Sequence, residues 1–323
     1  MSDGRAGVVP GTGHDGRGAV GAETIQVVVG CDDGYARHLA VMLLSLFAHS
    51  RTLPVRVHVM VSPAFASRGQ LDEAMGEHAG KLTYYGLATE AVPGPVDRTD
   101  ITAATYYRLL IGGVLPADLD RVIYLDSDML VCCDVVDLWR QPLGTAVVGA
   151  VPDPGFKDRH VLGLPSGSSY FNAGLLLIDL KSWRGTSVGS DALAFRIACP
   201  ERITYDDQCA LNWVLRGRWA KLDDVWNMQI RAFADLTGKG VRYFHPVPTA
   251  GQAARVVHFN APGRPWTYMD EHPFKPAYLR YQAQTPWRDE RPADRYPHNI
   301  IIKTLRRYAP PLLPVYKFIR RYV

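Results

Sequence analysis

The sequence predicts an α/β fold in which helices cover both faces of a mostly parallel sheet. Short runs of β-branched and apolar residues alternate along the chain with longer segments in which apolar residues recur at helical spacing. Strands that alternate with helices in this way usually form parallel sheets, because each helix carries the chain back across one face. No internal repeat at a period of 20–50 residues interrupts the alternation.

Each predicted element follows from its local pattern. The run "TIQVVVG" is rich in β-branched residues and ends in glycine, as a strand does where it meets a loop. The segment "YARHLAVMLLSLFAHS" places apolar residues at 39, 43, 46 and 47, the spacing of a helix packed on a sheet. By the same criteria the sequence predicts strands at 24–30, 55–61, 81–87, 121–126, 145–151 and 254–260, an apolar run at 169–180, and helices at 35–50, 70–79, 104–115 and 206–217.

The composition is that of a soluble globular protein. Hydrophobic residues make up 47% of the 323 residues and charged residues 21%. A net charge of +4 does not indicate a nucleic-acid partner. The five cysteines are odd in number and form no CxxC pair, which predicts a reducing, cytoplasmic environment and no structural zinc site. No run of about 18 apolar residues indicates a membrane span.

Three regions are expected along the chain. Residues 1–23 are rich in glycine and lack the apolar segment of a signal peptide, so they predict a disordered leader. Residues 24–268 contain the predicted strands and form the main domain. Residues 269–323 form a helical, basic extension, whose last acidic residue is Asp294. The basic residues beyond it are Arg295, Lys303, Arg306, Arg307, Lys317, Arg320 and Arg321.

The tail at 296–323 interleaves Lys and Arg with Ile, Leu, Tyr and Phe. Segments of this composition often lie on an anionic bilayer, so we expect peripheral contact with the inner face of the membrane. The structural alternative is a terminal helix that packs on the domain and exposes a basic face. Three prolines, Pro310, Pro311 and Pro314, divide the tail into two pieces.

Two carboxylates at the end of a predicted strand raise the question of function. In "RVIYLDSDMLV", Asp126 and Asp128 follow an apolar run with one serine between them. Burying one carboxylate costs several kcal/mol, and a second one beside it adds repulsion, so a cation is expected there. Oxygen ligands suit Mg²⁺ or Mn²⁺, and an added imidazole favours Mn²⁺. In the simpler alternative, Asp126 caps the next turn and Asp128 is solvated.

The place of this pair in the predicted sheet favours the cation. Ligands of open α/β sheets bind beyond the carboxyl ends of the strands. Asp32 and Asp33 follow the first predicted strand, just as Asp126 and Asp128 follow "VIYL". We therefore expect both acid pairs to open onto one crevice, where an ion would bind a diphosphate and stabilise its charge.

A second class of enzyme also places DxD after an apolar strand. Phosphatases of the haloacid dehalogenase type use the first aspartate as nucleophile and the second as acid and base. They also carry a later acidic pair, often in a GDxxxD setting. This sequence has no GDxxxD, and "KLDDVW" is a poor substitute. A Mg²⁺-dependent phosphatase is therefore kept as the alternative enzyme.

Five stretches in a fixed order are more specific than the DxD pair alone. They are "VVVGCDDGYARHLAVMLLSL", "ATYYRLLIGGVLP" with the following "DRVIYLDSDMLV", "YFNAGLLLIDLKSWR", "YDDQCALN" and "VVHFNAPGRPW". Together, from about residue 26 to residue 266, they resemble glycosyltransferase family 8, which includes glycogenin and bacterial lipooligosaccharide galactosyltransferases.

The resemblance implies a GT-A fold, with a Rossmann-like, mostly parallel mixed sheet, over residues 24–268. It also implies retaining transfer of a hexosyl group, of galactose or glucose type, from a UDP-sugar donor to an acceptor hydroxyl. The expected acceptor is a glycan, a lipid-linked molecule or a small molecule. A catalytically silent sugar-nucleotide-binding protein is a third class consistent with the same motifs.

The resemblance also implies a role for individual positions. Asp126, Asp128 and His258 would ligate Mn²⁺, with Mg²⁺ as the alternative ion. The residues expected to bind the nucleotide and its diphosphate are Gly30, Asp32, Tyr35, Arg108, Ser127, Ala261 and Arg264.

On the sugar side, the resemblance places Asp153, Asn172 and Asp207 on sugar hydroxyls and Gln208 beneath the anomeric carbon. Together with Arg264, Asp207 and Gln208 would be the catalytic residues. Retention then follows one of two routes. Either Asp207 or Gln208 attacks to form a covalent intermediate, or the acceptor enters on the face that the leaving phosphate vacates. Because an amide is a poor nucleophile, the second route is favoured.

The closing motif departs from the family pattern at two positions. Arg264 stands where the family has lysine, and Ala261 where it has glycine. Arginine keeps the charge but is longer and planar, and alanine restricts a backbone that lies close to phosphates. Gly34 replaces the polar residue that is common after the first acid pair. These departures bear on the choice of donor sugar.

Overall fold

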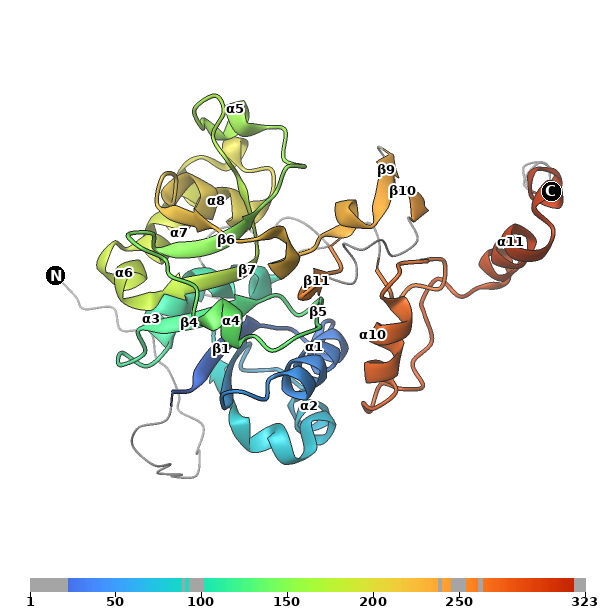
Figure 1. Cartoon of the computed structure of the whole chain (residues 1–323), viewed down its shortest axis with the longest axis horizontal. Helices are drawn as coiled ribbons and strands as arrows, with labels where there is room; N and C mark the ends of the chain where they lie inside the picture. Colours follow the sequence, from blue (N-terminus) through green and yellow to red (C-terminus); the bar gives the residue numbers. More distant parts are fainter. Residues whose placement is uncertain are drawn as a thin grey trace.

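The computed structural model describes residues 23–88, 91–92, 102–237, 240–244, 254–260 and 264–316; for residues 234–237 and 240–244 it describes the backbone alone. Within these ranges the protein is an α/β molecule built on one large sheet (Figure 1). The strands of that sheet, in spatial order, are β3 (Leu82–Gly86), β2 (Val55–Val61), β1 (Ile25–Gly30), β4 (Arg121–Leu125), β7 (Phe171–Asp179), β6 (Val148–Pro152) and β8 (Trp219–Lys221).

The sheet is parallel except at one strand. Strands β3, β2, β1 and β4 pair in parallel, and so do β6 and β8, whereas β7 runs antiparallel to both of its neighbours. The carboxyl ends of β1 and β4 therefore lie at the same edge as the amino end of β7. Residues that follow β1 and β4 meet residues that begin β7 at that edge, as the rule for open α/β sheets predicts.

Helices cover the two faces of the sheet. One face packs on α1 (Ala36–His49) and α2 (Arg68–Met75), and the other on the 3₁₀ helix η3 (Ala103–Leu110), α7 (Val188–Ala198) and α8 (Asp206–Val214). The remaining helical segments are η1 (Gly76–Lys81), α3 (Ile111–Val114), α4 (Val136–Trp139), α5 (Arg159–Leu162), α6 (Leu180–Gly185), η4 (Pro200–Arg202), η5 (Asp224–Trp226), η6 (Ile230–Ala232), α10 (Lys275–Gln282), α11 (Pro297–Tyr308) and η7 (Pro310–Leu312).

The two faces can be followed residue by residue along each strand. In β1, Ile25, Val27 and Val29 point into one hydrophobic cluster, while Val28 points into the other. Side chains alternate along a strand, so a strand buried on both faces needs an unbroken apolar run. The sequence run 24–30 has that character, and the predicted strand was confirmed with its first residue at Ile25.

A short second pairing brings a distant segment to the functional edge. Strand β11 (Val256–His258) runs antiparallel to β5 (Met129–Val131), with His258 opposite Met129. The backbone N–H of Phe259 also donates to the carbonyl oxygen of Asp128 at 2.9 Å. The last residue of β11 is thereby placed beside the DxD turn. A third pair, β9 (Ala234–Thr237) with β10 (Gly240–Phe244), forms a separate hairpin.

The C-terminal part has two different environments (Figure 1). Helix α10 lies beside α1, where Tyr278 is buried and its hydroxyl lies 2.6 Å from Nδ1 of His38. Helix α11 lies farther from the sheet and exposes Ile300, Ile301 and Tyr308. Among the helices of the described ranges, none combines the length and the apolar character that crossing a bilayer requires. Residues 1–22 of the predicted leader and residues 317–323 of the predicted tail lie outside the described ranges.

Candidate active site

A polar cleft of about 230 Å³ opens at the edge where β1 and β4 end. Its walls combine the loop after β1, the start of η3 and the turn after β4. The residues that form the cleft are Gly30, Cys31, Asp32, Tyr35, Thr102, Ala104, Thr105, Arg108, Tyr124, Asp126, Ser127 and Asp128. The cleft therefore gathers seven of the residues predicted from the sequence for the nucleotide, the diphosphate and the metal: Gly30, Asp32, Tyr35, Arg108, Asp126, Ser127 and Asp128.

The side of the cleft after β1 is fixed by backbone contacts. The Asp32 carboxylate accepts hydrogen bonds from the Tyr35 N–H at 2.9 Å and from the Thr102 hydroxyl at 2.5 Å. Gly30 allows a close approach of two segments, because a Cβ there would lie 2.8 Å from the carbonyl oxygen of Ala104. The Ser127 hydroxyl donates to the Gly30 carbonyl at 3.0 Å and so joins the ends of β1 and β4.

Asp33 does not join the cleft, which corrects the expectation that both acid pairs would open onto it. Its carboxylate accepts hydrogen bonds from the N–H and the hydroxyl of Ser67, at 2.8 Å and 2.7 Å. Both residues lie in the loop after β1, where the contact with Ser67 turns the Asp33 carboxylate away from the crevice. The spacing of Asp126 and Asp128, with one residue between them, allows both to face it.

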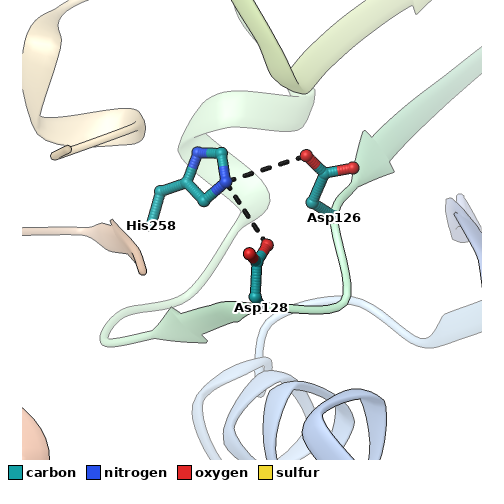
Figure 2. A group of neighbouring side chains, drawn as sticks. All are labelled: Asp126, Asp128 and His258. Carbon is teal, nitrogen blue, oxygen red and sulfur yellow. Dashed lines mark ion pairs between the residues drawn. The ribbon is translucent and has the colours of Figure 1, made fainter. Parts of the chain in front are cut away.

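Three potential metal ligands converge at the DxD turn (Figure 2). Nε2 of His258 lies 3.3 Å from Oδ1 of Asp128 and 3.7 Å from Oδ2 of Asp126. One ligand atom from each of the three side chains lies within 4.8 Å of the others. Two carboxylate oxygens and one imidazole nitrogen form a donor set that suits Mn²⁺ and also accepts Mg²⁺.

The backbone behind this group leaves room for it. A Cβ on Gly174 would lie 2.8 Å from Oδ2 of Asp126 and 2.8 Å from Nδ1 of His258, and closer still to Cε1 of His258. Real Cβ atoms essentially never approach other atoms this closely, so the ligand group occupies the space that a side chain at 174 would fill. The donor chemistry and this cradle both fit a bound divalent cation.

In the absence of a cation the group is held together by its own charges. Burial disfavours both charged forms, but the carboxylates raise the pKa of the His258 imidazole above its usual value, and the imidazolium lowers the pKa of Asp128. A metal ion requires the neutral imidazole, so metal binding would displace the proton from His258.

Arg108 neutralises the carboxylates that face it. Its guanidinium donates to Oδ1 of Asp126 at 2.8 Å and to the carbonyl oxygen of Ala173 at 2.7 Å. It also lies over the ring of Tyr124, whose hydroxyl donates to the same Asp126 oxygen at 2.8 Å. This arrangement excludes the simpler alternative in which Asp126 only caps a turn, and it makes Arg108 part of the site and not a surface residue.

Asp207 lies on the far side of Arg108, with Oδ2 2.8 Å from Nε of the arginine. The Nε–H itself is directed to the carbonyl oxygen of Thr105 at 3.2 Å, so Oδ2 of Asp207 accepts no hydrogen bond from the described residues. Burial raises the pKa of Asp207 to about 7; the charge of Arg108 opposes that rise and the charge of Asp126 adds to it. Asp207 is therefore a buried carboxyl whose Oδ2 lies against the Arg108 guanidinium without a hydrogen bond.

The raised pKa of Asp207 predicts a pH-dependent effect on stability in the metal-free protein. Well below pH 3.8 the carboxyl is protonated in both the folded and the unfolded chain, so it adds no pH dependence to the free energy of unfolding. Between the usual value of 3.8 and about 7 the unfolded chain loses the proton first, so the folded state becomes less stable as the pH rises. Asp207→Asn removes this loss. We expect the stability advantage of the variant to be small at pH 4 and to grow to roughly a few kcal/mol at pH 8, measured by urea unfolding.

Asp191→Asn is the matched control for this measurement, because Asp191 is exposed on α7. Its stability should follow that of the wild type at both pH values. Equal stability of wild type and Asp207→Asn at pH 8 would contradict the raised pKa.

The amino end of β7 contributes a set of amide side chains. Oδ1 of Asn172 accepts from the Gly174 N–H at 3.0 Å, and its Nδ2 donates to Oε1 of Gln208 at 3.1 Å. Nε2 of Gln208 donates to Oδ2 of Asp153 at 3.4 Å. The structure thus brings the predicted sugar-side residues Asp153, Asn172 and Gln208 into direct contact with one another. The hydrogen-bond partners that a buried asparagine requires are present.

The closing segment places Arg264 near the opening of the cleft. Arg264 is exposed, and its guanidinium lies 5.9 Å from the centre of the Trp266 ring. Burial raises the pKa of the Tyr35 hydroxyl, and the charge of Arg264 partly offsets that rise. Trp266 packs on His38 with ring centroids 3.8 Å apart and meets Tyr35 edge-to-face at 6.5 Å. Ala261 lies outside the described residues.

Several residues of the site were missed by sequence reasoning. Thr102 binds Asp32, Tyr124 binds Asp126, and Asn227 lies 3.0 Å from Nδ1 of His258. The only sequence signal for Asn227 is a polar residue between Trp226 and Met228, both buried. Trp266 was part of the closing motif, but its contact with His38 depends on how α1 packs and cannot be read from the motif.

Similarity to known proteins identifies the family to which this chain belongs. The model described as "Glycosyl transferase family 8" matches residues 26–270, which is most of the chain. The protein belongs to glycosyl transferase family 8.

Relatives of this family 8 protein include bacterial enzymes of lipopolysaccharide synthesis. General stress protein A of Bacillus subtilis (strain 168) is 28% identical over 277 residues, which span 82% of this chain and 95% of the relative. Lipopolysaccharide 1,3-galactosyltransferase of Salmonella typhimurium is 25% identical over 278 residues, 82% of this chain and 80% of the relative.

Among solved structures, the galactosyltransferase LgtC in complex with donor and acceptor sugar analogues superposes with a TM-score of 0.70. It is 25% identical in sequence, and the match covers 82% of this chain and 99% of that one. The mixed seven-stranded sheet with its flanking helices is therefore the GT-A fold that the motifs predicted. As a member of family 8 with these relatives, the protein is a glycosyltransferase.

Proposed function

We propose that this family 8 protein is a retaining glycosyltransferase that uses Mn²⁺ and a UDP-sugar donor. It would move a hexosyl group, of galactose or glucose type, to an acceptor hydroxyl. The observation that carries the proposal is the convergence of Asp126, Asp128 and His258 in the cleft that also contains Asp32 and Tyr35. The GT-A catalytic domain would span residues 24–268, with 269–323 as the C-terminal extension and 1–23 as a disordered leader.

The nucleotide would lie against the loop after β1. The Asp32 carboxylate is already oriented by the Tyr35 N–H and the Thr102 hydroxyl, so it can accept a hydrogen bond from a ribose hydroxyl without reorganisation. The ring of Tyr35 lines the same cleft and offers a face for stacking on uracil. Gly30 lines the cleft beside the position proposed for the base.

The diphosphate would lie at the DxD turn. A divalent cation bound by Asp126, Asp128 and His258 would supply charge neutralisation for the leaving diphosphate. Arg108 holds Asp126 in place through a buried ion pair of 2.8 Å, and Arg264 brings a second positive charge to the opening of the cleft. Ser127 would offer its backbone, and Ala261 its backbone in the closing segment.

The contacts of Gln208 favour the same-face route to retention. Oε1 of Gln208 accepts from the Ala173 N–H at 3.0 Å and from Asn172, and its Nε2 reaches Asp153. An amide whose oxygen already accepts two hydrogen bonds is a poor nucleophile, so Gln208 would position the sugar and not attack it. Asp207, held beside Arg108, would accept a sugar hydroxyl. The acceptor hydroxyl would then pass its proton to the departing phosphate on the same face.

The names of the relatives support the type of sugar and the class of acceptor that we propose. Two act in lipopolysaccharide synthesis as 1,2-glucosyl- and 1,3-galactosyltransferase, and LgtC is a galactosyltransferase solved with sugar analogues. We accordingly infer a glycan or lipid-linked acceptor, with a small molecule as the remaining possibility. No nucleic-acid partner is proposed. The location would be cytoplasmic, with peripheral contact at the inner face of the membrane.

Incubation of the protein with Mn²⁺ and a panel of UDP-sugars tests the function directly. Slow release of UDP from UDP-galactose or UDP-glucose, stopped by EDTA, is the expected result. Hydrolysis of p-nitrophenyl phosphate in place of the UDP-sugars would favour the phosphatase instead. Binding of UDP and Mn²⁺ with no UDP release from any donor would indicate the silent binding protein.

The exposed face of α11 predicts binding to anionic vesicles. Ile300, Ile301 and Tyr308 are exposed on the helix, and Arg306 and Arg307 occupy its last turn. Each basic residue near an anionic surface contributes about 1 kcal/mol, so reversing two charges should lower binding at least tenfold. We expect the wild type to float with vesicles containing phosphatidylglycerol, and the variant Arg306→Glu with Arg307→Glu to stay largely unbound.

Vesicles of phosphatidylcholine alone serve as the control for charge, and a chain that ends at residue 295 as the control for the tail. Equal flotation of the wild type and the shortened chain with anionic vesicles would rule out this membrane contact.

A further inference from the structure

A continuous chain of amide side chains leads from the metal-ligand group to the sugar side of the site. Nδ1 of His258 lies 3.0 Å from Oδ1 of Asn227, and Nδ2 of Asn227 donates to Oδ1 of Asn172 at 2.8 Å. Asn172 in turn donates to Gln208, which donates to Asp153. Asn227 is only 2% exposed, so water does not substitute for these contacts.

Two backbone N–H groups fix the direction of every hydrogen bond in this row of amide side chains. The Gly174 N–H can only donate, so the atom of Asn172 that faces it is the oxygen. The Ala173 N–H fixes the oxygen of Gln208 in the same way. Because Oδ1 of Asn172 is an acceptor, the atom of Asn227 that meets it is the NH₂ group.

The orientation of Asn227 then determines the state of His258. With its NH₂ group committed to Asn172, Asn227 presents its oxygen to Nδ1 of His258, and an oxygen requires Nδ1 to carry a hydrogen. The lone pair of a neutral imidazole is then on Nε2, the atom that faces Asp126 and Asp128. The opposite tautomer would set an acceptor against an acceptor at a buried position, which costs about 1–3 kcal/mol.

We propose that Asn227 is a positioning residue, which holds His258 in the Nδ1–H tautomer so that Nε2 can ligate the catalytic cation. The inference rests on the proposed function, because it concerns the same metal site. It extends that function by assigning Asn227, which belongs to none of the motifs, and by linking the metal ligand to Gln208 through Asn172. Partners of metal-bound histidines typically contribute 10–100-fold to metal affinity.

Titration with Mn²⁺, read as the loss of the free-ion signal in electron paramagnetic resonance, measures this contribution without any turnover. Asn227→Leu has a similar volume and removes both hydrogen bonds. We expect its Mn²⁺ dissociation constant to rise about 10–100-fold relative to the wild type. Asn260→Leu is the matched control, since Asn260 is an amide near β11 that is partly buried and contacts Gln229 and Ile230 but neither His258 nor Asn172. It should change the constant less than threefold.

Two results would overturn the inference. One is Mn²⁺ affinity in Asn227→Leu equal to that of the wild type. The other needs no variant of Asn227. In the wild type with ¹⁵N-labelled histidine, at alkaline pH, the His258 resonance should show hydrogen on Nδ1, and hydrogen on Nε2 contradicts the proposal. The resonance is identified by its loss in His258→Gln. A wild type that binds no Mn²⁺ at all would refute the proposed function itself, and this outcome is distinguishable from the other two.

Discussion

Replacing Asp126 and Asp128 together by alanine is expected to abolish Mn²⁺ binding and to lower release of UDP from a UDP-sugar by at least about a thousandfold. Each residue supplies a carboxylate to the group with His258, and removal of both leaves one imidazole, which does not hold Mn²⁺ alone. Loss of a single group that stabilises transition-state charge already costs about 10²–10³-fold in rate. The measurements are Mn²⁺ titration and UDP release.

The same double substitution also removes a partner of Arg108, so folding must be checked separately. Arg108 retains its contacts with Asp207 and with the carbonyl oxygen of Ala173, which should keep it in place. Cys132→Ser serves as the control outside the cleft and should leave both measurements unchanged. Normal turnover in the double variant would refute the metal role of the pair.

Gly174→Ala is also expected to weaken Mn²⁺ binding strongly, although it removes none of the three ligands. The added Cβ would lie within 3 Å of Oδ2 of Asp126 and of the buried His258 ring. The ligand group must therefore spread apart. We expect Mn²⁺ affinity to fall about 10–100-fold, the range that is typical when the residues supporting metal ligands are changed.

The control for this substitution is Gly113→Ala. A Cβ on Gly113 would meet nothing within 4 Å, so the added methyl group alone should have little effect. A urea unfolding curve separates loss of the site from loss of the fold. Wild-type Mn²⁺ affinity in a folded Gly174→Ala variant would show that the three ligands do not act from the positions seen here.

Much of the site could be predicted because its residues stand next to strands. Asp32 and Asp126 follow strands that the apolar pattern marks clearly, and parallel strands bring their carboxyl ends to one edge. That argument applied equally to Asp33, where it was wrong, because the Asp33 carboxylate in the loop after β1 binds Ser67 instead. Pattern alone does not say which of two adjacent acids faces the cleft.

The residues that sequence reasoning missed share a different property. Asn227 and Thr102 act through partners that lie far away in the chain, and each partner is reached only after the elements have packed. Their own local patterns resemble those of ordinary loop residues. His258 was found because it belongs to a motif of the family, not because its position could be derived from spacing.

The sequence by itself determined the α/β class, the strands that end at the functional edge and, through five ordered motifs, the membership of family 8. These properties depend on local periodicity and on short segments, which a chain carries whether or not it is folded. Only the tertiary structure decided that β11 pairs with β5, so that His258 reaches Asp126 and Asp128, and that Asn227 stands behind His258. Contacts between residues that are far apart in the sequence form only when the packed strands and helices bring them together, and no local pattern records that outcome.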